Sequence, residues 1–295
     1  MSDLELIRLE GFGKELLKHK NKIFPYFANH LLKIKSLKVK NDDVFVVAYP
    51  KSGTTWTEEI VWLVENNLDF EKASTVSHTD RVLFLDEKPL DQSEQALSPR
   101  VFKTHLTFEY LPDQVETNAK VIYVMRNPKD MLVSFFHFAK WIKGFSFSGK
   151  FDAILDLFLQ DKIIYGNWCE HVNQFFANSN VLFITFEDLI EEPFETTEKI
   201  ASYLGKKLSN EQIQSLVEFT SFKQMRKNSS FCFQETDKNS EHNQLDLFFR
   251  KGEIGDWVNY FDEQMSSKLE NKLKNELNPN ILIKYFSSAT KKLIN

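Results

Sequence analysis

Apolar residues along the chain fall into two patterns, short uninterrupted runs and longer helical repeats. The short runs, at 44–49 (VFVVAY), 121–125 (VIYVM) and 181–185 (VLFIT), are typical of strands buried on both faces of a parallel sheet. Helical periodicity is clearest at 54–66, 128–143, 151–160, 162–178 and 194–204. This alternation predicts an α/β fold with a central parallel β-sheet flanked by helices.

No linker rich in Pro, Gly or Ser divides the chain, and no break in composition marks a boundary. We therefore expect a single domain over residues 1–295. Segment 228–247 is polar and weakly periodic, which predicts a mobile loop. Hydrophobic residues make up 42% of the chain and charged residues 27%, which is the balance of a soluble protein with a sizeable core.

The overall charge limits the kind of partner. A formal net charge of −5 argues against a protein that coats nucleic acid, so an anion site must be a local cluster of basic residues and backbone N–H groups. The N-terminus is charged from its first residues, and no apolar run approaches the roughly 18 residues of a membrane span. We expect a cytoplasmic protein without a membrane partner. Two isolated cysteines, Cys169 and Cys232, predict reduced thiols rather than a disulfide or a zinc site.

Segment 48–56, AYPKSGTTW, joins the first predicted strand to the first predicted helix. Residues 52–55 can turn so that successive N–H groups point inward, and Thr55 with Glu58 fits a capping box for the following helix. A helix N-terminus with hydroxyl groups and the neighbouring Lys51 is suited to hold an anion. The loop is not a Walker A motif, because a single Gly follows the Lys and no carboxylate for Mg²⁺ is evident.

A similar arrangement follows the strand predicted at 121–125. Arg126 ends that strand, and Asn127 and Pro128 fit the cap and the first position of the next helix. Asp130 would complete a capping box. These residues predict a second place where a helix begins beside a basic side chain.

Two further features belong with this second cluster. Ser134 lies two turns into the predicted helix. In segment 248–257, FFRKGEIGDW, a flexible Gly252 would let the backbone and the side chains of Arg250 and Lys251 wrap a phosphate. Each piece alone favours a solvated charge pair, but together with segment 48–56 they predict two separate anionic groups on one nucleotide.

A candidate base lies in the extended segment RVFKTHL, at 100–106. Lys103 and His105 are two residues apart, which places both side chains on one face of a strand. Histidine can accept a proton near neutral pH, and the lysine can neutralise developing charge. Beside an anion site, this pair predicts catalysis.

Four segments, in order and at compatible spacing, resemble the cytosolic sulfotransferase family. They are YPKSGTTW (49–56), FKTHL (102–106), RNPKDMLVSFFHF (126–138) and RKGEIGDW (250–257). Weaker similarity fills the gaps, so the resemblance covers nearly the whole chain. The conjunction of the four segments is far more specific than any one of them.

The resemblance implies the co-substrate 3′-phosphoadenosine 5′-phosphosulfate (PAPS) and a role for each motif. By this resemblance the 5′-phosphosulfate would be held by Lys51, Ser52, Gly53, Thr54, Thr55 and Trp56. The 3′-phosphate would be held by Arg126, Ser134, Arg250, Lys251 and Gly252, and the adenosine by Thr220, Ser221, Phe222 and Phe249. His105 matches the catalytic base of the family. Lys51 would stabilise the departing phosphate oxygen and Lys103 the sulfuryl oxygens, and no metal would be required.

The same resemblance concerns the acceptor. Phe84 and Phe138 align with aromatic residues that gate the family's pocket, and Phe24, Phe145 and Phe147 could join its wall. Such a pocket favours a small lipophilic alcohol, phenol or steroid over a sugar polymer. The individual acceptor is not readable from the sequence.

The chain departs from the family pattern in three places. Phe186 stands where Tyr is common, which could remove one hydrogen bond toward the nucleotide, and Thr107 replaces a Pro beside the candidate base. The segment associated with family dimers is missing after residue 257, which makes a dimer by that route doubtful.

Two other functions compete with the sulfotransferase. One is an NTP-dependent kinase with the same P-loop nucleotide-kinase-like architecture, whose mark would be a full Walker loop and Mg²⁺ ligands. The other is a non-catalytic homologue that binds 3′,5′-diphosphoadenosine (PAP) without turnover. The presence of His105, Lys51 and Lys103 together argues against it.

Overall fold

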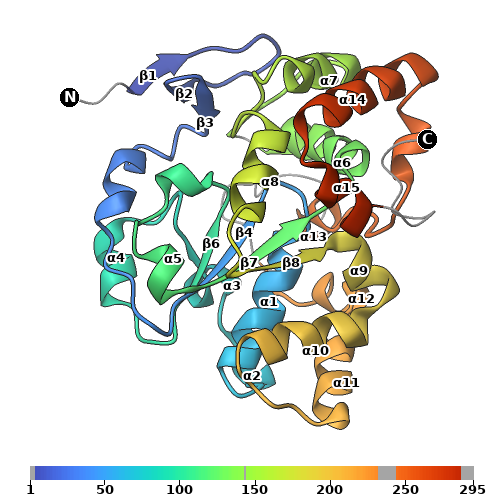
Figure 1. Ribbon diagram of the computed structural model, residues 1–295. Coiled ribbons are helices and arrows are strands. Elements are labelled where there is room, and N and C mark those ends of the chain that lie inside the picture. The colour runs from blue at the N-terminus through green and yellow to red at the C-terminus, as the bar shows by residue number, and fades with distance from the viewer. Residues whose placement is uncertain (1–3, 143, 232–243, 287–295) are drawn as a thin grey trace.

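The computed structural model describes residues 4–142, 144–231 and 244–286, and its ribbon is shown in Figure 1. Most of the loop predicted at 228–247 and also Cys232 lie outside the described residues, whereas Gln244–Phe248 form helix α13. Cys169 is a buried free thiol. No helix in the described ranges is long and apolar enough to cross a membrane.

A parallel sheet of five strands forms the centre of the molecule, in the order β5–β6–β4–β7–β8. Its strands are β4 (Val44–Ala48), β5 (Leu83–Phe84), β6 (Val101–Thr104), β7 (Lys120–Met125) and β8 (Val181–Thr185). The three strands predicted from apolar runs are confirmed as neighbours, β4, β7 and β8. Strand β6 lies within the extended segment at 100–106, and the two-residue β5 was not predicted.

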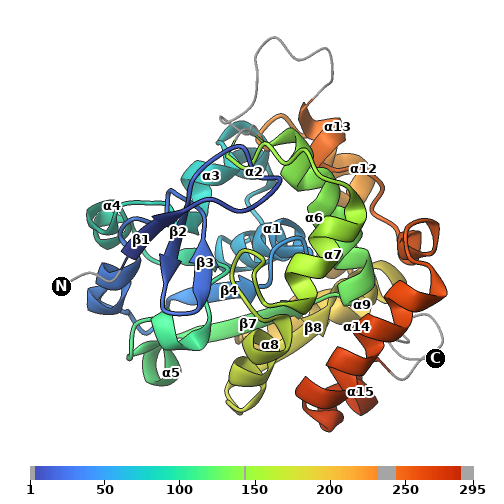
Figure 2. The same cartoon turned by 90° about the horizontal axis from the view of Figure 1, so that it is seen from above.

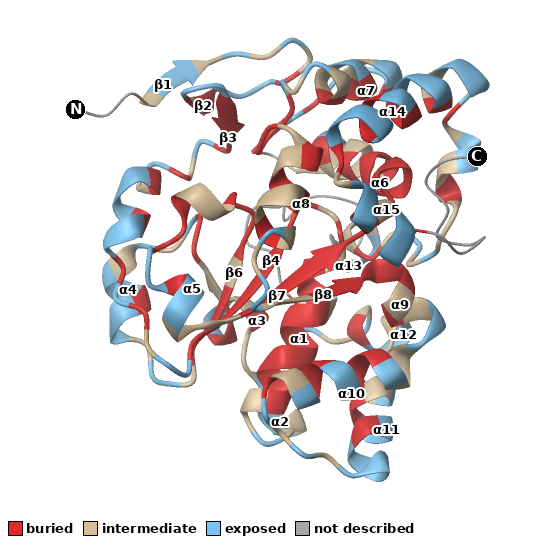
Figure 3. Ribbon diagram, viewed as in Figure 1, coloured by how far each residue is buried: buried red, intermediate tan, exposed pale blue. Residues whose placement is uncertain are grey.

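Helices cover both faces of this sheet. Side chains of β4 alternate between two apolar clusters, so that Phe45 and Val47 face one and Val44 and Val46 face the other. Helices α6 (Pro128–Trp141), α8 (Trp168–Phe176) and α14 (Glu263–Glu276) cover the first face, and α1 (Thr54–Glu65), α10 (Pro193–Tyr203) and α11 (Asn210–Phe219) the second. Strand β4 is buried along its whole length and β7 from Val121 onward, which Figure 3 shows as red ribbon at the centre of the molecule. The predicted α/β fold is confirmed.

Shorter elements connect these layers. The remaining α-helices are α2 (Phe70–Thr75), α3 (His78–Arg81), α4 (Leu90–Gln95), α5 (Val115–Asn118), α7 (Phe151–Leu159), α9 (Phe186–Glu191), α12 (Phe222–Met225) and α15 (Pro279–Tyr285). The 3₁₀ helices are η1 (Leu31–Ser36), η2 (Phe108–Tyr110) and η3 (Asp256–Asn259). A separate antiparallel sheet of β1 (Leu4–Ile7), β2 (Leu16–His19) and β3 (Lys22–Phe24), visible in Figure 2, was not predicted.

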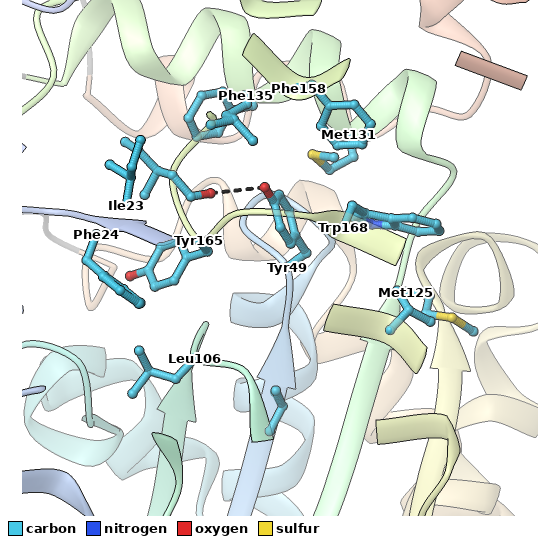
Figure 4. Close-up of a cluster of buried hydrophobic side chains, with 14 of the residues drawn as sticks. Ile23, Phe24, Tyr49, Leu106, Met125, Met131, Phe135, Phe158, Tyr165 and Trp168 are labelled. Atoms are coloured by element: carbon cyan, nitrogen blue, oxygen red, sulfur yellow. Dashed lines mark hydrogen bonds between the residues drawn. The ribbon is translucent and has the colours of Figure 1, made fainter. Parts of the chain in front are cut away.

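One predicted helix is substantially shorter in the structure. The pattern at 162–178 predicted a single helix, but α8 begins only at Trp168, because Asn167 caps it by accepting from the Glu170 N–H. Before the cap, Tyr165 adopts a positive φ of 68°. The Tyr49 hydroxyl donates to the carbonyls on both sides of that residue, Ile164 and Gly166, at 3.0 and 2.8 Å. Figure 4 shows Tyr49 and Tyr165 in this core.

Candidate active site

A cavity of about 360 Å³ lies where β4, β6 and β7 end. The carboxyl ends of parallel strands meet at one edge of a sheet, and ligands of α/β proteins bind there. The loops after all three strands contribute to its wall, together with residues 248–253 and parts of α3 and α6. Segments that are far apart in sequence, 50–56, 103–105, 126–145 and 248–253, are thus brought together.

The loop after β4 forms part of the cavity wall. Its backbone turns through positive φ values at Lys51 (69°) and Gly53 (97°), and Gly53 is the N-cap of α1. A Cβ at Gly53 would lie 2.8 Å from the Phe186 ring, so this position requires glycine both for its φ and for space. No side chain among the described residues caps the helix. The capping box predicted for Thr55 and Glu58 is therefore wrong, and the amino end of α1 faces the cavity uncapped.

Several polar atoms here are buried without a partner. Ser52 Oγ, Trp56 Nε1 and Arg126 Nε have no hydrogen bond within the part of the chain that the structure describes. All three atoms can donate, and a buried donor normally has an acceptor. Together with the uncapped helix end, they fit an anion rather than a cation.

Lys51 stands at the centre of these basic groups. Its Nζ lies 4.4 Å from the ring centroid of Phe138 and 4.2 Å from that of Phe248. Burial and the nearby cations Lys103, Arg126 and Arg250 lower the pKa of Lys51 to about 7. A bound anion would reverse this effect, because it favours the charged ammonium.

Arg126 connects the second basic segment to the first. Its guanidinium donates to the carbonyls of Lys51 and Glu253, at 3.2 and 3.3 Å, and lies 4.1 Å from the ring centroid of Phe186. Phe186, where the family commonly has Tyr, thus covers this guanidinium and limits the space beside Gly53.

Helix α6 holds segment 250–257 in place. Asn127 caps the helix and Pro128 occupies its first position, as predicted. Asp130, however, does not complete a capping box, because its carboxylate accepts from the N–H groups of Gly255 at 2.7 Å and Trp257 at 2.9 Å. The capping box predicted for Asp130 is therefore wrong, and this residue links two distant segments instead.

Asp256 orders the basic side chains of that segment. It accepts from Arg250 at 2.6 Å and from Lys251 at 2.5 Å. Although burial opposes it, these hydrogen bonds and one from Asn259 lower the pKa of Asp256 to about 2. The pair Arg250 and Lys251 is therefore pre-positioned beside Gly252, which has a φ of 68° and packs on Phe222.

The polar atoms of His105 are held from several directions. Its ring Nδ1 lies 2.7 Å from the Ala48 carbonyl. Its backbone N–H donates to the Asp86 carboxylate at 3.1 Å, and its backbone carbonyl is 2.9 Å from His171 Nε2. A carbonyl can only accept, so Nδ1 carries the ring proton and Nε2 keeps its lone pair. Burial and Lys103 lower the pKa of His105 well below its usual range, so the imidazole is neutral at pH 7.

Asp86 was not identified from the sequence, where it ends the weakly similar run RVLFLD at 81–86. Its carboxylate accepts from Thr104 Oγ1 at 2.6 Å and from the Tyr165 hydroxyl at 2.9 Å, in addition to the His105 N–H. Burial raises the pKa of Asp86 to about 6, against the effect of these hydrogen bonds. Asp86 thus fixes the backbone that presents the candidate base.

Aromatic rings form another part of the wall. Phe84, Phe138 and Phe145 line the cavity together with Phe27 and Trp141. Lys103 also lines it, with Nζ 4.4 Å from the Phe84 ring centroid.

Two phenylalanines expected in this wall lie elsewhere. Phe24 packs on Tyr110 and Tyr165 in the core, with centroids 5.3 and 5.9 Å apart, as Figure 4 shows for its position near Tyr165. Phe147 packs on Phe12 at 5.1 Å. Neither lines the cavity.

The other expected site residues are divided between the cavity wall and the layer behind it. Those in the wall are Lys51, Gly53, Thr54, Thr55, Trp56, Lys103, His105, Arg126, Ser134, Phe222, Phe249, Arg250, Lys251 and Gly252. Ser52, Thr220 and Ser221 are not among the lining residues, and Thr220 Oγ1 donates to the Leu216 carbonyl. Glu58, His78, Met225 and Phe248 line the cavity without having been expected there.

Thr107 has φ −68° and ψ 157°, a conformation that Pro would also adopt.

Fold and site together define an α/β nucleotide-binding protein of the P-loop-like class, with a basic cavity at the carboxyl ends of the strands. The model of the Sulfotransferase domain family matches residues 41–279. The chain is 34% identical to sulfotransferase 1B1 of Canis lupus familiaris over 92% of this chain and 96% of that protein. It is 31% identical to sulfotransferase 1E1 of Bos taurus over 84% and 88% of the two chains. The chain belongs to the sulfotransferase family.

Solved structures agree with this assignment. Retinol dehydratase in complex with androsterone and the inactive cofactor PAP superposes with a TM-score of 0.77 at 26% identity, over 93% of this chain and 96% of that one. Mouse sulfotransferase SULT7A1 complexed with PAP gives a TM-score of 0.74 at 28% identity, over 88% and 94%. The protein is a PAPS-dependent sulfotransferase, and sulfuryl transfer replaces the kinase alternative.

Proposed function

We propose that this protein transfers the sulfuryl group of PAPS to a hydroxyl or amine of a small lipophilic acceptor, with His105 as the general base. The observation that carries the proposal is the hydrogen bond from Nδ1 to the Ala48 carbonyl, which leaves the Nε2 lone pair on a neutral, cavity-lining imidazole. A base must be unprotonated and must reach the acceptor, and a neutral imidazole in the cavity wall supports this role for His105.

The reaction needs a proton acceptor and charge stabilisation at two places. PAPS supplies an activated sulfuryl group. His105 Nε2 takes the proton of the acceptor hydroxyl, whose oxygen forms the new bond to sulfur. Lys51 stabilises the phosphate oxygen that keeps the electron pair of the broken bond, and Lys103 stabilises the sulfuryl oxygens. Most of the rate acceleration then comes from positioning and from fixed positive charge.

We assign the nucleotide to the end of the cavity formed by loop 50–56 and segment 249–253, the nucleotide end. Ser134, Arg126 and residues 250–252 are proposed to bind the 3′-phosphate, and the uncapped amino end of α1 the 5′-phosphate. The rings of Trp56, Phe222 and Phe249 are proposed to hold the adenine. Thr220 and Ser221 are assigned to the adenosine by resemblance alone.

The acceptor is assigned to the rings of Phe84, Phe138 and Phe145, the acceptor end. An apolar wall with few polar groups fits an alcohol, phenol or steroid better than a sugar. Retinol dehydratase has been solved with androsterone and with retinol, both of which suit such a wall.

Binding of the co-substrate is tested by thermal stabilisation. We expect PAP to raise the melting temperature and ATP–Mg²⁺ or adenosine 5′-monophosphate (AMP) to raise it far less, since only PAP carries both phosphates. A shift with ATP–Mg²⁺ alone would contradict the proposed nucleotide.

The base is tested with His105→Ala and labelled PAPS. We expect turnover to fall at least about 100-fold while PAP affinity stays within about tenfold. His137→Ala is the matched control, because His137 lies outside the cavity and bonds to the Tyr260 hydroxyl. Retained turnover in His105→Ala would exclude His105 as the base.

A further inference from the structure

One acidic side chain in the cavity is explained neither by the anion site nor by the base. Glu58 lies on α1 one turn after Thr54, and both residues line the cavity. Glu58 is 0% exposed, and neither of its carboxyl oxygens has a hydrogen-bond partner among residues 4–142, 144–231 and 244–286. A buried carboxylate without a partner is costly, and a nearby bound anion makes it more so.

Charged or titratable groups face Glu58 from three elements. From α3, His78 places Nε2 3.3 Å from Glu58 Oε2, without hydrogen-bond geometry. From β6, Lys103 acts as a nearby cation, although its Nζ lies over the Phe84 ring. From α1 itself, Glu59 adds negative charge, which Arg81 balances through an ion pair of 2.9 Å.

Of the two neighbouring side chains Glu58 and His78, Glu58 is the one that can carry a proton near pH 7. Burial raises the pKa of Glu58 to about 7, with Lys103 opposing the change and Glu59 adding to it. Burial, Arg81 and Lys103 lower the pKa of the neighbouring His78 well below its usual range. Near pH 7 the imidazole is therefore neutral, and the carboxyl is close to half protonated.

We propose that Glu58 is a proton-carrying residue of the nucleotide site, which takes up one proton from solvent when the nucleotide anion binds. The protonated carboxyl removes a repulsive charge from the cavity and gains a donor that an anionic oxygen can accept. By linkage, nucleotide affinity then falls as the pH rises through the pKa of this carboxyl in the free protein. The inference rests on the nucleotide site proposed above.

The test compares PAP dissociation constants of the unmodified protein and Glu58→Gln at about pH 6 and about pH 8.5. Glutamine keeps the size of the side chain and cannot ionise. At about pH 6 we expect the two constants to agree within about twofold, because Glu58 is mostly protonated. At about pH 8.5 we expect Glu58→Gln to bind up to roughly 30-fold more tightly, since an acid with a pKa of about 7 is then mostly ionised.

The ratio of the two constants isolates Glu58 from the other titrating group. Lys51 also has its pKa lowered to about 7, but it is present in both proteins, and its effect cancels in the ratio. Glu65→Gln is the matched control, because it removes the same charge from α1 outside the cavity, where Glu65 pairs with Lys206. Its ratio should not change with pH.

Two results would overturn the inference. The first is a ratio of PAP dissociation constants, between the unmodified protein and Glu58→Gln, that is the same at both pH values. The second is weaker PAP binding by Glu58→Gln at both pH values, which would make the carboxylate a direct ligand. Glu58→Ala provides the same comparison if the glutamine variant does not fold. Failure of the unmodified protein to bind PAP at either pH would instead contradict the nucleotide site itself.

Discussion

Backbone geometry and hydrogen bonds shape the nucleotide end of the cavity, whereas packed rings shape the acceptor end. At the nucleotide end, Gly53 turns the chain with a φ of 97°, Arg126 holds the Lys51 carbonyl, and Asp130 holds two N–H groups of segment 250–257. At the acceptor end, Phe138 and Phe145 meet edge to face at 5.9 Å, with no polar link between their side chains. The geometry of the nucleotide end therefore depends on fixed backbone positions and hydrogen bonds, and that of the acceptor end on how the rings pack.

Because of this difference, we expect the two ends to differ in how they tolerate amino-acid substitutions. A hydrogen bond to a fixed N–H group has one geometry, and a buried polar group left without it costs free energy. A ring contact varies more gradually, because apolar side chains of similar volume can repack. Substitutions at the nucleotide end should therefore lower PAP affinity strongly, and substitutions at the acceptor end should change the KM for the acceptor only a little.

The largest effect on PAP affinity is expected for Gly53→Ala. The added Cβ would lie 2.8 Å from the Phe186 ring, and a left-handed conformation costs roughly 1–2 kcal/mol for a residue with a side chain. We expect PAP affinity, measured by calorimetry, to fall about 30- to 100-fold.

Gly205→Ala separates backbone strain from the site. Gly205 has a φ of 79° and follows α10, outside the cavity. Among the described residues, only Lys120 Nζ lies near an added Cβ, at 3.5 Å. This variant should lose stability without losing PAP affinity. Equal PAP affinity in both variants would show that the loop after β4 does not contact the nucleotide.

Most of the fold was predictable because its central elements carry uninterrupted local patterns. Strands β4, β7 and β8 are continuous apolar runs, which is typical of strands covered on both faces. Strand β5 has two residues, too few for any periodicity. The late start of α8 depends partly on the Asn167 cap, which is local, and partly on the Tyr49 hydroxyl, which holds residues 164–166 across more than 100 residues and which no local pattern reveals.

The nucleotide end was easier to predict than its detailed contacts. Backbone turns need particular residues at particular positions, so segment 48–56 was recognisable as a tight turn between a strand and a helix, with positive φ at Lys51 and Gly53. The capping box at Glu58 was wrong because α1 begins earlier than a cap at Thr55 requires, with Gly53 as its N-cap, and the box at Asp130 because a distant segment takes that carboxylate. At the acceptor end, Phe24 and Phe145 look alike in sequence, and only packing separates the core residue from the wall.

A smaller effect is expected for Arg250→Ala, also at the nucleotide end. Its guanidinium is oriented by Asp256 and is proposed to bind the 3′-phosphate. Hydrogen bonds to charged groups contribute roughly 1.5–3 kcal/mol, so we expect PAP affinity to fall at least about tenfold and AMP affinity to change less than about twofold.

Arg226→Ala is the control, because Arg226 lies outside the cavity and pairs with Asp246 at 2.7 Å. Equal losses of PAP and AMP affinity in Arg250→Ala would refute the assignment of the 3′-phosphate.

The smallest effect is expected at the acceptor end, for Phe145→Leu. Leucine keeps the wall apolar but loses ring contacts with Phe138 and Phe12, each worth roughly 0.5–1.5 kcal/mol. We expect the KM for a lipophilic phenol to rise about three- to fivefold with PAP affinity unchanged. Phe24→Leu makes the same substitution behind the wall and should lower thermal stability without changing that KM. If Phe24→Leu changes the KM and Phe145→Leu does not, the acceptor lies on the other side of Tyr165. The rings of Phe84, Phe138 and Phe145 then do not determine which acceptor binds.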